Sequence, residues 1–302
     1  MTVEAPARSA HDLPLVRSRM VGSLRIHALE AGMIRLDGGA MFGVVPRPLW
    51  EQRIPPDDRN RIALSLRCLL VEAPDVLVLI DTGAGNKGSE KFRDIYGVEN
   101  DGNPTRLEEA IRSAGFQPHD VDVVLDTHLH FDHAGGNTVE MPDGSLVPAF
   151  PGARYVVQEG EFDFAHRNND RIRASYRAGD MDPIRDAGLW DFVDGEVEIV
   201  PGIGVLPTPG HTPHHHSVLL ESDGEKACFL ADVCPTSAHL RPAWVMGYDL
   251  EPLRTMEAKE GLWKRALDEE WLLIFQHDAS VPWGRLDPDS PDPMLKEESD
   301  HA

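Results

Sequence analysis

The chain has 302 residues, 41% of them hydrophobic and 26% charged, and these values fit a soluble globular protein with a large core. Its 51 acidic and 29 basic residues give a formal charge of -22, which argues against nucleic acid and anionic membrane surfaces as partners. The cysteines are too sparse for a disulfide framework, no apolar run reaches membrane-spanning length, and residues 1–20 contain no secretion signal. We therefore expect a cytoplasmic protein.

Alternating or apolar runs between turn residues predict strands, and helical periodicity predicts helices. Strands are expected, in chain order, over residues 24–29, 63–71, 76–80, 121–125, 154–157, 197–200, 205–207, 217–221, 226–230 and 271–275. Helices are expected over residues 107–114, 159–177 and 252–269, with a possible break in the second. The strands thus form two sets with helices between and after them, and two packed sheets covered by helices would satisfy this order.

Three segments lie outside these elements. Residues 1–21 predict a flexible N-terminal arm, and residues 287–302 predict a disordered acidic tail. Residues 38–56 predict a loop rich in glycine, proline and exposed apolar side chains. One domain over residues 22–286 is therefore expected.

The densest group of metal-ligand side chains directly follows the strand predicted over residues 121–125. Residues 127–136 contain His128, His130, Asp132 and His133, followed by Gly135 and Gly136. Imidazoles and a carboxylate suit zinc and other borderline divalent ions. The first two histidines are two positions apart, so an extended segment points both the same way. The turn that follows can aim the second pair at a neighbouring ion.

This segment resembles the His-x-His-x-Asp-His motif of the metallo-β-lactamase-fold hydrolases. Further motifs of that superfamily follow in the expected order around Asp81-Thr82-Gly83, Pro209-Gly210-His211, Leu230-Ala231-Asp232 and Gln276-His277-Asp278. The resemblance implies an α/β fold, a four-layer αββα sandwich of two mixed β-sheets flanked by helices.

The resemblance also implies two divalent metal ions, zinc first, with Mn2+, Fe2+ and Co2+ as alternatives. One ion would take His128, His130 and His211. The other would take Asp132, His133 and His277, and Asp232 would bridge both. The activity implied is hydrolysis by a metal-bound hydroxide, and Asp132 would orient this hydroxide or receive the proton that the bound water loses. Asp81 is expected to support the site loops without binding an ion.

Other polar side chains near these motifs have open roles. The resemblance makes His215 a support for the site, while the triplet His214, His215 and His216 could also form an additional metal site. Tyr248 and His239 are candidate catalytic residues that could steady an oxyanion. For His239 the alternative is a structural histidine.

The substrate is indicated only by apolar loops around Met41, Trp50 and residues 242–248, which suggest a small neutral or partly apolar molecule. The motif spacing most resembles the lactonase-like branch, including quorum-quenching N-acyl-homoserine lactonases and related phosphotriester hydrolases. We therefore expect a lactone- or ester-opening hydrolase, with a phosphotriester or thioester hydrolase as the alternative. One departure is that Val233-Cys234-Pro235 stands where better-known lactonases have a tyrosine.

Two further alternatives stay open. A non-catalytic metal-binding scaffold would require a lost ligand, and none is missing from the expected set. The apolar loop over residues 41–50 could also cover a second subunit, so a homodimer is compatible with the sequence.

Overall fold

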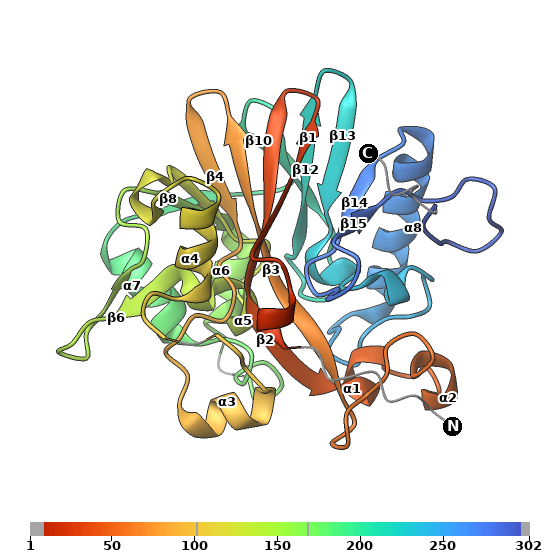
Figure 1. Ribbon diagram of the computed structural model, residues 1–302, viewed down its shortest axis with the longest axis horizontal. Coiled ribbons are helices and arrows are strands. Elements are labelled where there is room, and N and C mark those ends of the chain that lie inside the picture. Colours follow the sequence, from red (N-terminus) through yellow and green to blue (C-terminus); the bar gives the residue numbers. More distant parts are fainter. Residues whose placement is uncertain (1–8, 101, 168, 297–302) are drawn as a thin grey trace.

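Two β-sheets lie face to face at the centre of the fold, and helices cover their outer faces (Figure 1). The computed structural model describes residues 9–100, 102–167 and 169–296. The arrangement is the four-layer αββα sandwich that the sequence motifs implied.

The first sheet has the strand order β1-β2-β3-β4-β5-β8-β9. Its strands are β1 (Val16–Val21), β2 (Leu24–Asp37), β3 (Arg61–Ala73), β4 (Val76–Ile80), β5 (Val123–Leu125), β8 (Arg154–Gln158) and β9 (Trp190–Val193). Pairing is antiparallel from β1 to β4 and parallel from β4 to β9. The tight turn between β3 and β4 contains Asp75 at φ 59°, a backbone conformation that aspartate tolerates well.

The second sheet has the order β10-β11-β12-β13-β14-β15. Its strands are β10 (Val197–Val200), β11 (Ile203–Pro207), β12 (His216–Ser222), β13 (Glu225–Phe229), β14 (Leu272–Ile274) and β15 (Trp283–Gly284). Asp223 and Gly224 both have positive φ, so they form the two-residue turn that suits the β12–β13 hairpin. A long connection containing α8 (Pro252–Asp268) makes β13 and β14 parallel.

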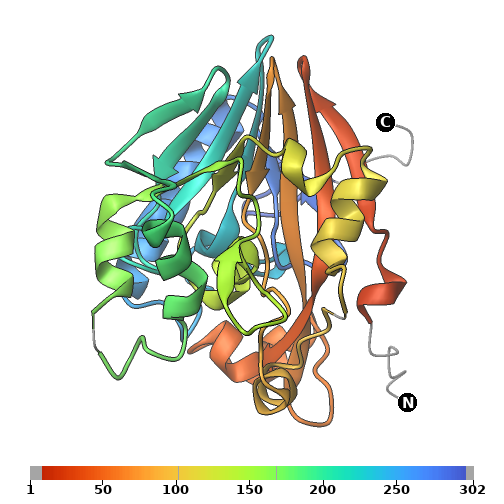
Figure 2. The same cartoon turned by 90° about the vertical axis from the view of Figure 1, so that its left-hand side faces the viewer.

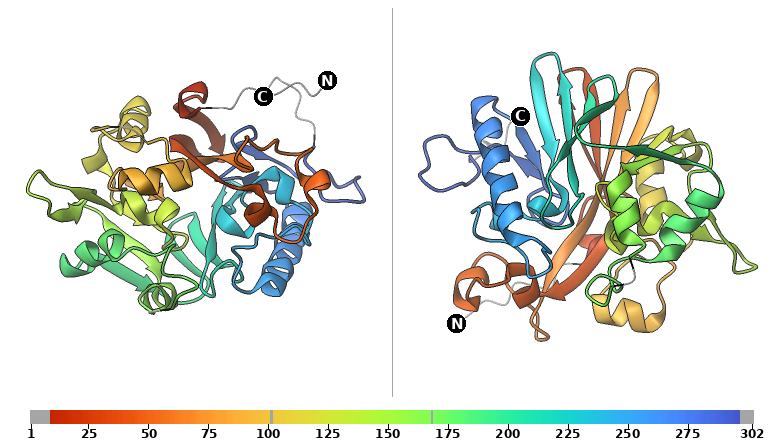
Figure 3. Two further views of the ribbon diagram at one scale, coloured as in Figure 1. Left: turned by 90° about the horizontal axis from the view of Figure 1, so that it is seen from below. Right: turned by 180° about the vertical axis from the view of Figure 1, so that it is seen from behind.

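The remaining elements lie around the sheets. They are α1 (Gly38–Phe42), α2 (Arg47–Trp50), α3 (Glu90–Tyr96), α4 (Arg106–Ser113), α5 (Phe131–Ala134), α6 (Glu159–Ala165), α7 (Ala178–Asp186) and the β6 (Thr138–Glu140)–β7 (Leu146–Pro148) hairpin. Figure 2 shows α4 over the first sheet, where it contacts β2, and the right panel of Figure 3 shows α8 along the second sheet. The helix expected over residues 107–114 is α4, and a capping box of Thr105 and Glu108 begins it.

Three apolar layers hold the sandwich together. Between the sheets, Ile26 and Val78 pack in one cluster with Val218 and Phe229. Outside the first sheet, residues of α4 join side chains of β2 and β3, and outside the second sheet Trp263 of α8 packs with residues of β13 and β14. Each fully buried side chain of this kind contributes about 1.5–3 kcal/mol relative to exposure.

Three sequence-based expectations are wrong for residues that the structure describes. The expected arm over residues 1–21 contains β1, which pairs with β2 along its whole length, although residues 1–8 lie outside the description. The expected loop over residues 38–56 contains α1 and α2, and its Met41, Phe42 and Trp50 are buried. Part of the expected tail also folds back, since Leu295 pairs with Leu286 and packs on the α8 cluster. Residues 297–302 lie outside the description.

The cysteine expectation agrees with the structure, since Cys68, Cys228 and Cys234 are buried and unpaired. Within the described ranges, none of the helices combines the length and apolar character that crossing a membrane requires.

Candidate metal centre

The motif residues meet at one edge of the sandwich because each follows a strand end. His128 and His130 follow β5, and Asp132 and His133 lie in α5, whose N-cap is His130. The second sheet supplies the other three. His211 lies between β11 and β12, Asp232 lies in a short 3-10 turn after β13, and His277 follows β14. Loops at strand ends are where α/β folds build their sites.

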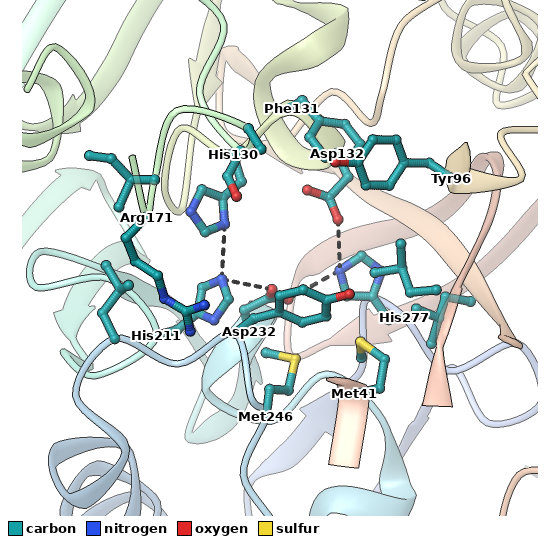
Figure 4. Close-up of a pocket in the computed structure, with 17 residues that line it drawn as sticks. Met41, Tyr96, His130, Phe131, Asp132, Arg171, His211, Asp232, Met246 and His277 are labelled. Carbon is teal, nitrogen blue, oxygen red and sulfur yellow. Dashed lines mark hydrogen bonds and ion pairs between the residues drawn. The ribbon is translucent and has the colours of Figure 1, made fainter. Parts of the chain in front are cut away.

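Asp232 stands between two groups of histidines (Figure 4). Its Oδ2 lies 3.1 Å from His211 Nε2, and its Oδ1 lies 3.1 Å from His277 Nε2 and 3.4 Å from His133 Nε2. His130 Nδ1 lies 3.0 Å from His211 Nε2. The carboxylate therefore lies between the two groups, at the position where the resemblance implies a bridging ligand.

The arrangement of the ring nitrogen atoms fits a divalent metal. Three sets have ligand atoms within 4.8 Å of one another: His128, His130 and His211; His128, His133 and Asp232; and Asp132, His133 and His277. His128 Nε2 is buried and has no hydrogen-bond partner among the described residues. His133 Nε2 and His277 Nε2 face each other at 3.3 Å. Ring nitrogens that converge on one another and on a carboxylate are suited to binding a cation with nitrogen and oxygen ligands.

The buried charges oppose one another. Burial would raise the pKa of Asp232, but the charges of His133, His211 and His277 hold it well below its usual range. Burial would lower the pKa of His133, but Asp232 and Asp132 raise it well above normal. Burial and the neighbouring histidines lower the pKa of His128 well below its usual range. The candidate metal centre therefore combines a neutral imidazole with carboxylates that favour positive charge on the other histidines.

A ring of acceptors fixes the orientation of the histidines. Asp81 Oδ2 lies 2.9 Å from His133 Nδ1, and Ser65 O lies 2.8 Å from His277 Nδ1. Asp249 Oδ1 lies 2.9 Å from His211 Nδ1. Each acceptor places the proton on Nδ1 and leaves Nε2 free for an ion. The support expected from Asp81 is thus present, whereas Asp249 had no recognisable sequence signal because it lies far from any motif.

The histidine triplet separates into different environments. His215 Nε2 accepts a hydrogen bond of 3.1 Å from the backbone N–H of Asp232, which agrees with the expected supporting role. His214 is exposed, and His216 is buried in β12. Among the described residues, no metal-ligand set includes any of the three, so the structure gives no support for an additional site there.

His239 is a correction to the candidate catalytic residues. Its ring nitrogens lie 2.7 Å from Thr236 Oγ1 and 2.9 Å from Met41 O, and its ring stacks on Phe42. Burial lowers the pKa of His239 to about 3, and the residue does not line the pocket. It is the structural histidine of the two alternatives.

A pocket of about 170 Å³ opens over the candidate metal centre. Its floor includes His130, Asp132, His211, Asp232 and His277. The other lining residues are Leu36, Met41, Leu64, Tyr96, Phe131, Arg171, Ile172, Ala174, Ser175, Met246, Tyr248 and Leu250. The walls are mainly apolar.

The apolar loops reach the pocket only in part. Met41, Met246 and Tyr248 line it, whereas Phe42 and Trp50 stack on each other away from it. Burial raises the pKa of the Tyr248 phenol to about 12, so the phenol remains a hydrogen-bond donor at neutral pH. Arg171, Ile172, Ala174 and Ser175 also line the pocket. They were expected within a helix over residues 159–177, but α6 ends at Ala165 and residues 171–175 form turns, so their place at the pocket was missed.

Sequence comparison finds similar proteins that are named as lactonases. An N-acyl homoserine lactonase from a Bacillus species is 31% identical over 170 residues, which cover 53% of this chain and 60% of the relative. The N-acyl homoserine lactonase AttM from Rhizobium radiobacter is 30% identical over 190 residues, which cover 60% of this chain and 64% of the relative. The chain therefore matches less than two thirds of the length of these relatives.

Structural comparison covers more of the chain. A probable metal-dependent hydrolase from Staphylococcus aureus has a TM-score of 0.84 and 31% identity, covering 93% of this chain and 100% of the other. AidC, a dizinc quorum-quenching lactonase in complex with a product, has a TM-score of 0.77 and 20% identity, covering 95% of this chain and 99% of the other. The second likeness concerns the fold alone. Residues 64–277 match the family model, and the chain belongs to the metallo-beta-lactamase superfamily.

Proposed function

We propose that this protein is a dinuclear metal-dependent hydrolase that opens a lactone or ester, with N-acyl-homoserine lactones as the favoured substrate class. The observation that carries the proposal is the position of Asp232, between two histidine groups on the floor of an apolar-walled pocket. The relatives named as N-acyl homoserine lactonases support the substrate class. Zinc is the favoured metal, with Mn2+, Fe2+ and Co2+ as the other candidates.

In the proposed mechanism, residues on the pocket floor carry out the reaction and residues on the walls bind the substrate. The histidines and carboxylates of the candidate metal centre would hold divalent ions, which would supply Lewis acidity and make a water acidic near neutral pH. Asp132 borders the pocket with Oδ2 3.8 Å from His277 Nε2, where it can accept a proton. The Tyr248 O–H can donate a hydrogen bond to an oxygen that gains negative charge. Met41, Phe131 and Met246 provide apolar surface for an acyl chain.

The same features suggest the partners. A chain of charge -22 with an apolar-walled pocket suits a small neutral or partly apolar substrate better than nucleic acid or an anionic membrane. The unpaired cysteines favour the reducing cytoplasm. Val44 and Leu49 are exposed in the 41–50 segment, which also supplies Met41 to the pocket. A homodimer that covers these two side chains is therefore part of the proposal.

The test is a hydrolysis panel with a pH indicator on zinc- and manganese-loaded protein. It compares N-acyl-homoserine lactones of different chain length with aryl esters, phosphotriesters, a thioester and a β-lactam. We expect lactone turnover that depends on acyl-chain length, together with two bound ions per chain by elemental analysis.

The variant Asp132→Asn shows whether any turnover depends on the candidate metal centre, because it keeps the side-chain shape and removes the charge. We expect it to abolish lactone turnover. Turnover of phosphotriesters or thioesters alone would keep the metal chemistry and reject the lactone. A protein that binds its metals and turns over no substrate would favour the non-catalytic scaffold.

A further inference from the structure

Arg171 is the only arginine or lysine among the described residues that line the pocket. It lies in a segment after α6 that also contributes Ile172 and Ser175 to the wall. The backbone of Ser175 accepts a 2.8 Å hydrogen bond from the N–H of Phe131, so this segment is tied directly to the metal motif. Figure 4 shows the Arg171 side chain on the His211 side of the pocket, across from Tyr96 and Asp132.

The guanidinium has most of its donors available. Arg171 Nη2 donates a 2.7 Å hydrogen bond to the backbone oxygen of Gly247. No carboxylate lies within ion-pair distance of it in the described part of a chain that has 51 acidic residues. By contrast, the neighbouring Arg173 pairs with Asp170 and Arg177 pairs with Asp180. Arginine has five N–H donors, and one backbone contact leaves the others for a ligand.

A purely structural role is the simpler explanation to weigh. The bond to Gly247 joins the 171–175 segment to the loop that carries Met246 and Tyr248, and it could serve only as a clamp. A clamp of this kind needs one donor and no permanent charge. A clamp does not account for a cation on an otherwise mainly apolar wall. The planar guanidinium of arginine, with its parallel N–H donors, matches carbonyl and carboxylate oxygens.

We propose that Arg171 is a specificity-determining residue that binds an unreactive oxygen acceptor of the substrate, an amide carbonyl or a carboxylate beside the ring that opens. This inference rests on the proposed function. The floor of the pocket is assigned to the ester group that reacts. An oxygen acceptor outside that ester group would therefore be held by the wall. In an N-acyl-homoserine lactone this acceptor is the amide carbonyl, whereas a plain alkyl γ-lactone has no oxygen outside its ester group.

The test compares wild type and Arg171→Met on three lactones of matched length: an N-acyl-homoserine lactone, an alkyl γ-lactone and a γ-lactone with a side-chain carboxylate. Methionine keeps much of the apolar stem and removes all donors. We expect kcat/KM on the acceptor-bearing lactone to fall about 10- to 100-fold, mostly through KM, because a hydrogen bond from a charged group is lost. We expect less than about a threefold change on the alkyl lactone, which has nothing for the fork to bind.

Two variants control for other effects. Arg173→Met removes a cation two residues away whose side chain is 72% exposed and does not line the pocket, and it should leave all three lactones unaffected. Arg171→Lys restores the charge without the planar fork and should recover only part of the loss. Metal content and melting temperature are measured for each variant, so that a damaged site is recognised.

The outcomes separate the hypotheses. A selective loss on the amide lactone or on the carboxylate lactone supports the proposal and identifies the acceptor. Equal losses on all three lactones would make Arg171 a loop clamp, and no loss on any would make its charge irrelevant; both overturn the inference while the lactonase activity stands. Wild-type protein that opens none of the three lactones would reject the proposed function, and the inference with it.

Discussion

Glu161 is a fully buried carboxylate that connects two of the segments carrying the candidate metal ligands. Its Oε1 accepts hydrogen bonds from the backbone N–H of Leu129 at 3.2 Å and from the Tyr176 hydroxyl at 2.8 Å. Its Oε2 accepts a 2.6 Å bond from Thr212 Oγ1. Leu129 lies between His128 and His130, and Thr212 follows His211, so one side chain sets the spacing of three ligands.

We expect Glu161→Ala to lower the affinity for zinc strongly, beyond what a general loss of fold stability would cause. The substitution leaves three buried donors without an acceptor, and the loss of partners behind metal ligands typically costs about 10- to 100-fold in metal affinity. The measurement is competition for zinc with a chelator, and cobalt absorption spectra report the ligand geometry directly.

The control for this prediction is Gln158→Ala. Gln158 is also buried, lies three positions earlier in the chain, and exchanges two hydrogen bonds with Gly195 instead of the ligand loops. It should lower the melting temperature without changing the affinity for zinc. A loss of zinc affinity equal to that of Glu161→Ala would mean that general destabilisation explains both.

At the scale of elements, Glu99 attaches the N-terminal segment to the first sheet. Its carboxylate accepts hydrogen bonds from the Ala10 N–H at 2.8 Å and the Ser9 hydroxyl at 3.0 Å, and it pairs with Arg35 of β2. Burial by itself would raise the pKa of Glu99, but these hydrogen bonds and the charge of Arg35 lower it below the ordinary value of 4.5. A lowered folded-state pKa means that the ionised carboxylate stabilises the fold.

We therefore expect the stability difference between wild type and Glu99→Gln to depend on pH. The contribution is fully present above the unfolded pKa of about 4.5 and is lost as the pH falls through the lower folded value. Because the pair is partly exposed, the difference should be about 1 kcal/mol or less at pH 7. Urea unfolding in the presence of EDTA at pH 7, 5 and 3.5 measures it without interference from metal.

Exposed Glu109 provides the comparison, since Glu109→Gln should show a much smaller pH-dependent difference. A difference for Glu99→Gln that grew on acidification would contradict the predicted sign.

The elements also show which parts of the fold local sequence patterns encode. The strands β3, β4, β12 and β13 were predicted because apolar runs end at clear turn residues such as Asp75 and Asp223. β1 was missed because it lies at the edge of its sheet and only Val21 is buried, so its sequence has no apolar pattern. α1 was missed because Gly38 and Gly39 resemble a loop, although the Asp37 side chain caps the helix at Ala40 N–H.

At the candidate site, too, features with a local sequence pattern were predicted and features that depend on distant contacts were not. The ligand motifs were recognisable because spacing within a few residues fixes their geometry, as for His128 and His130. Roles that depend on contacts between distant segments were not, which explains why Asp249 and Arg171 were missed and why Tyr248 and His239 could not be separated. Tyr248 lines the pocket, whereas both nitrogens of His239 are occupied by Thr236 and Met41.

At the scale of the whole molecule, the candidate metal centre joins the two sheets. His128, His130 and His133 follow β5 of the first sheet, and His211, Asp232 and His277 follow strands of the second. Ions held by both groups would link the halves of the sandwich at this edge. Binding that occurs only in the folded state adds its free energy to the stability of the fold.

We therefore expect removal of metal by EDTA to lower the melting temperature by about 10 °C or more, since ligand at 1,000 times its dissociation constant contributes about 4 kcal/mol. Re-addition of zinc should restore the value, which distinguishes metal loss from irreversible damage. Asp232→Asn should show a smaller shift on EDTA treatment, because it removes the negative charge placed between both histidine groups. A shift of less than about 2 °C in fully loaded wild type would mean that the sheets are held together by their apolar interface alone, and that the metals act only on chemistry.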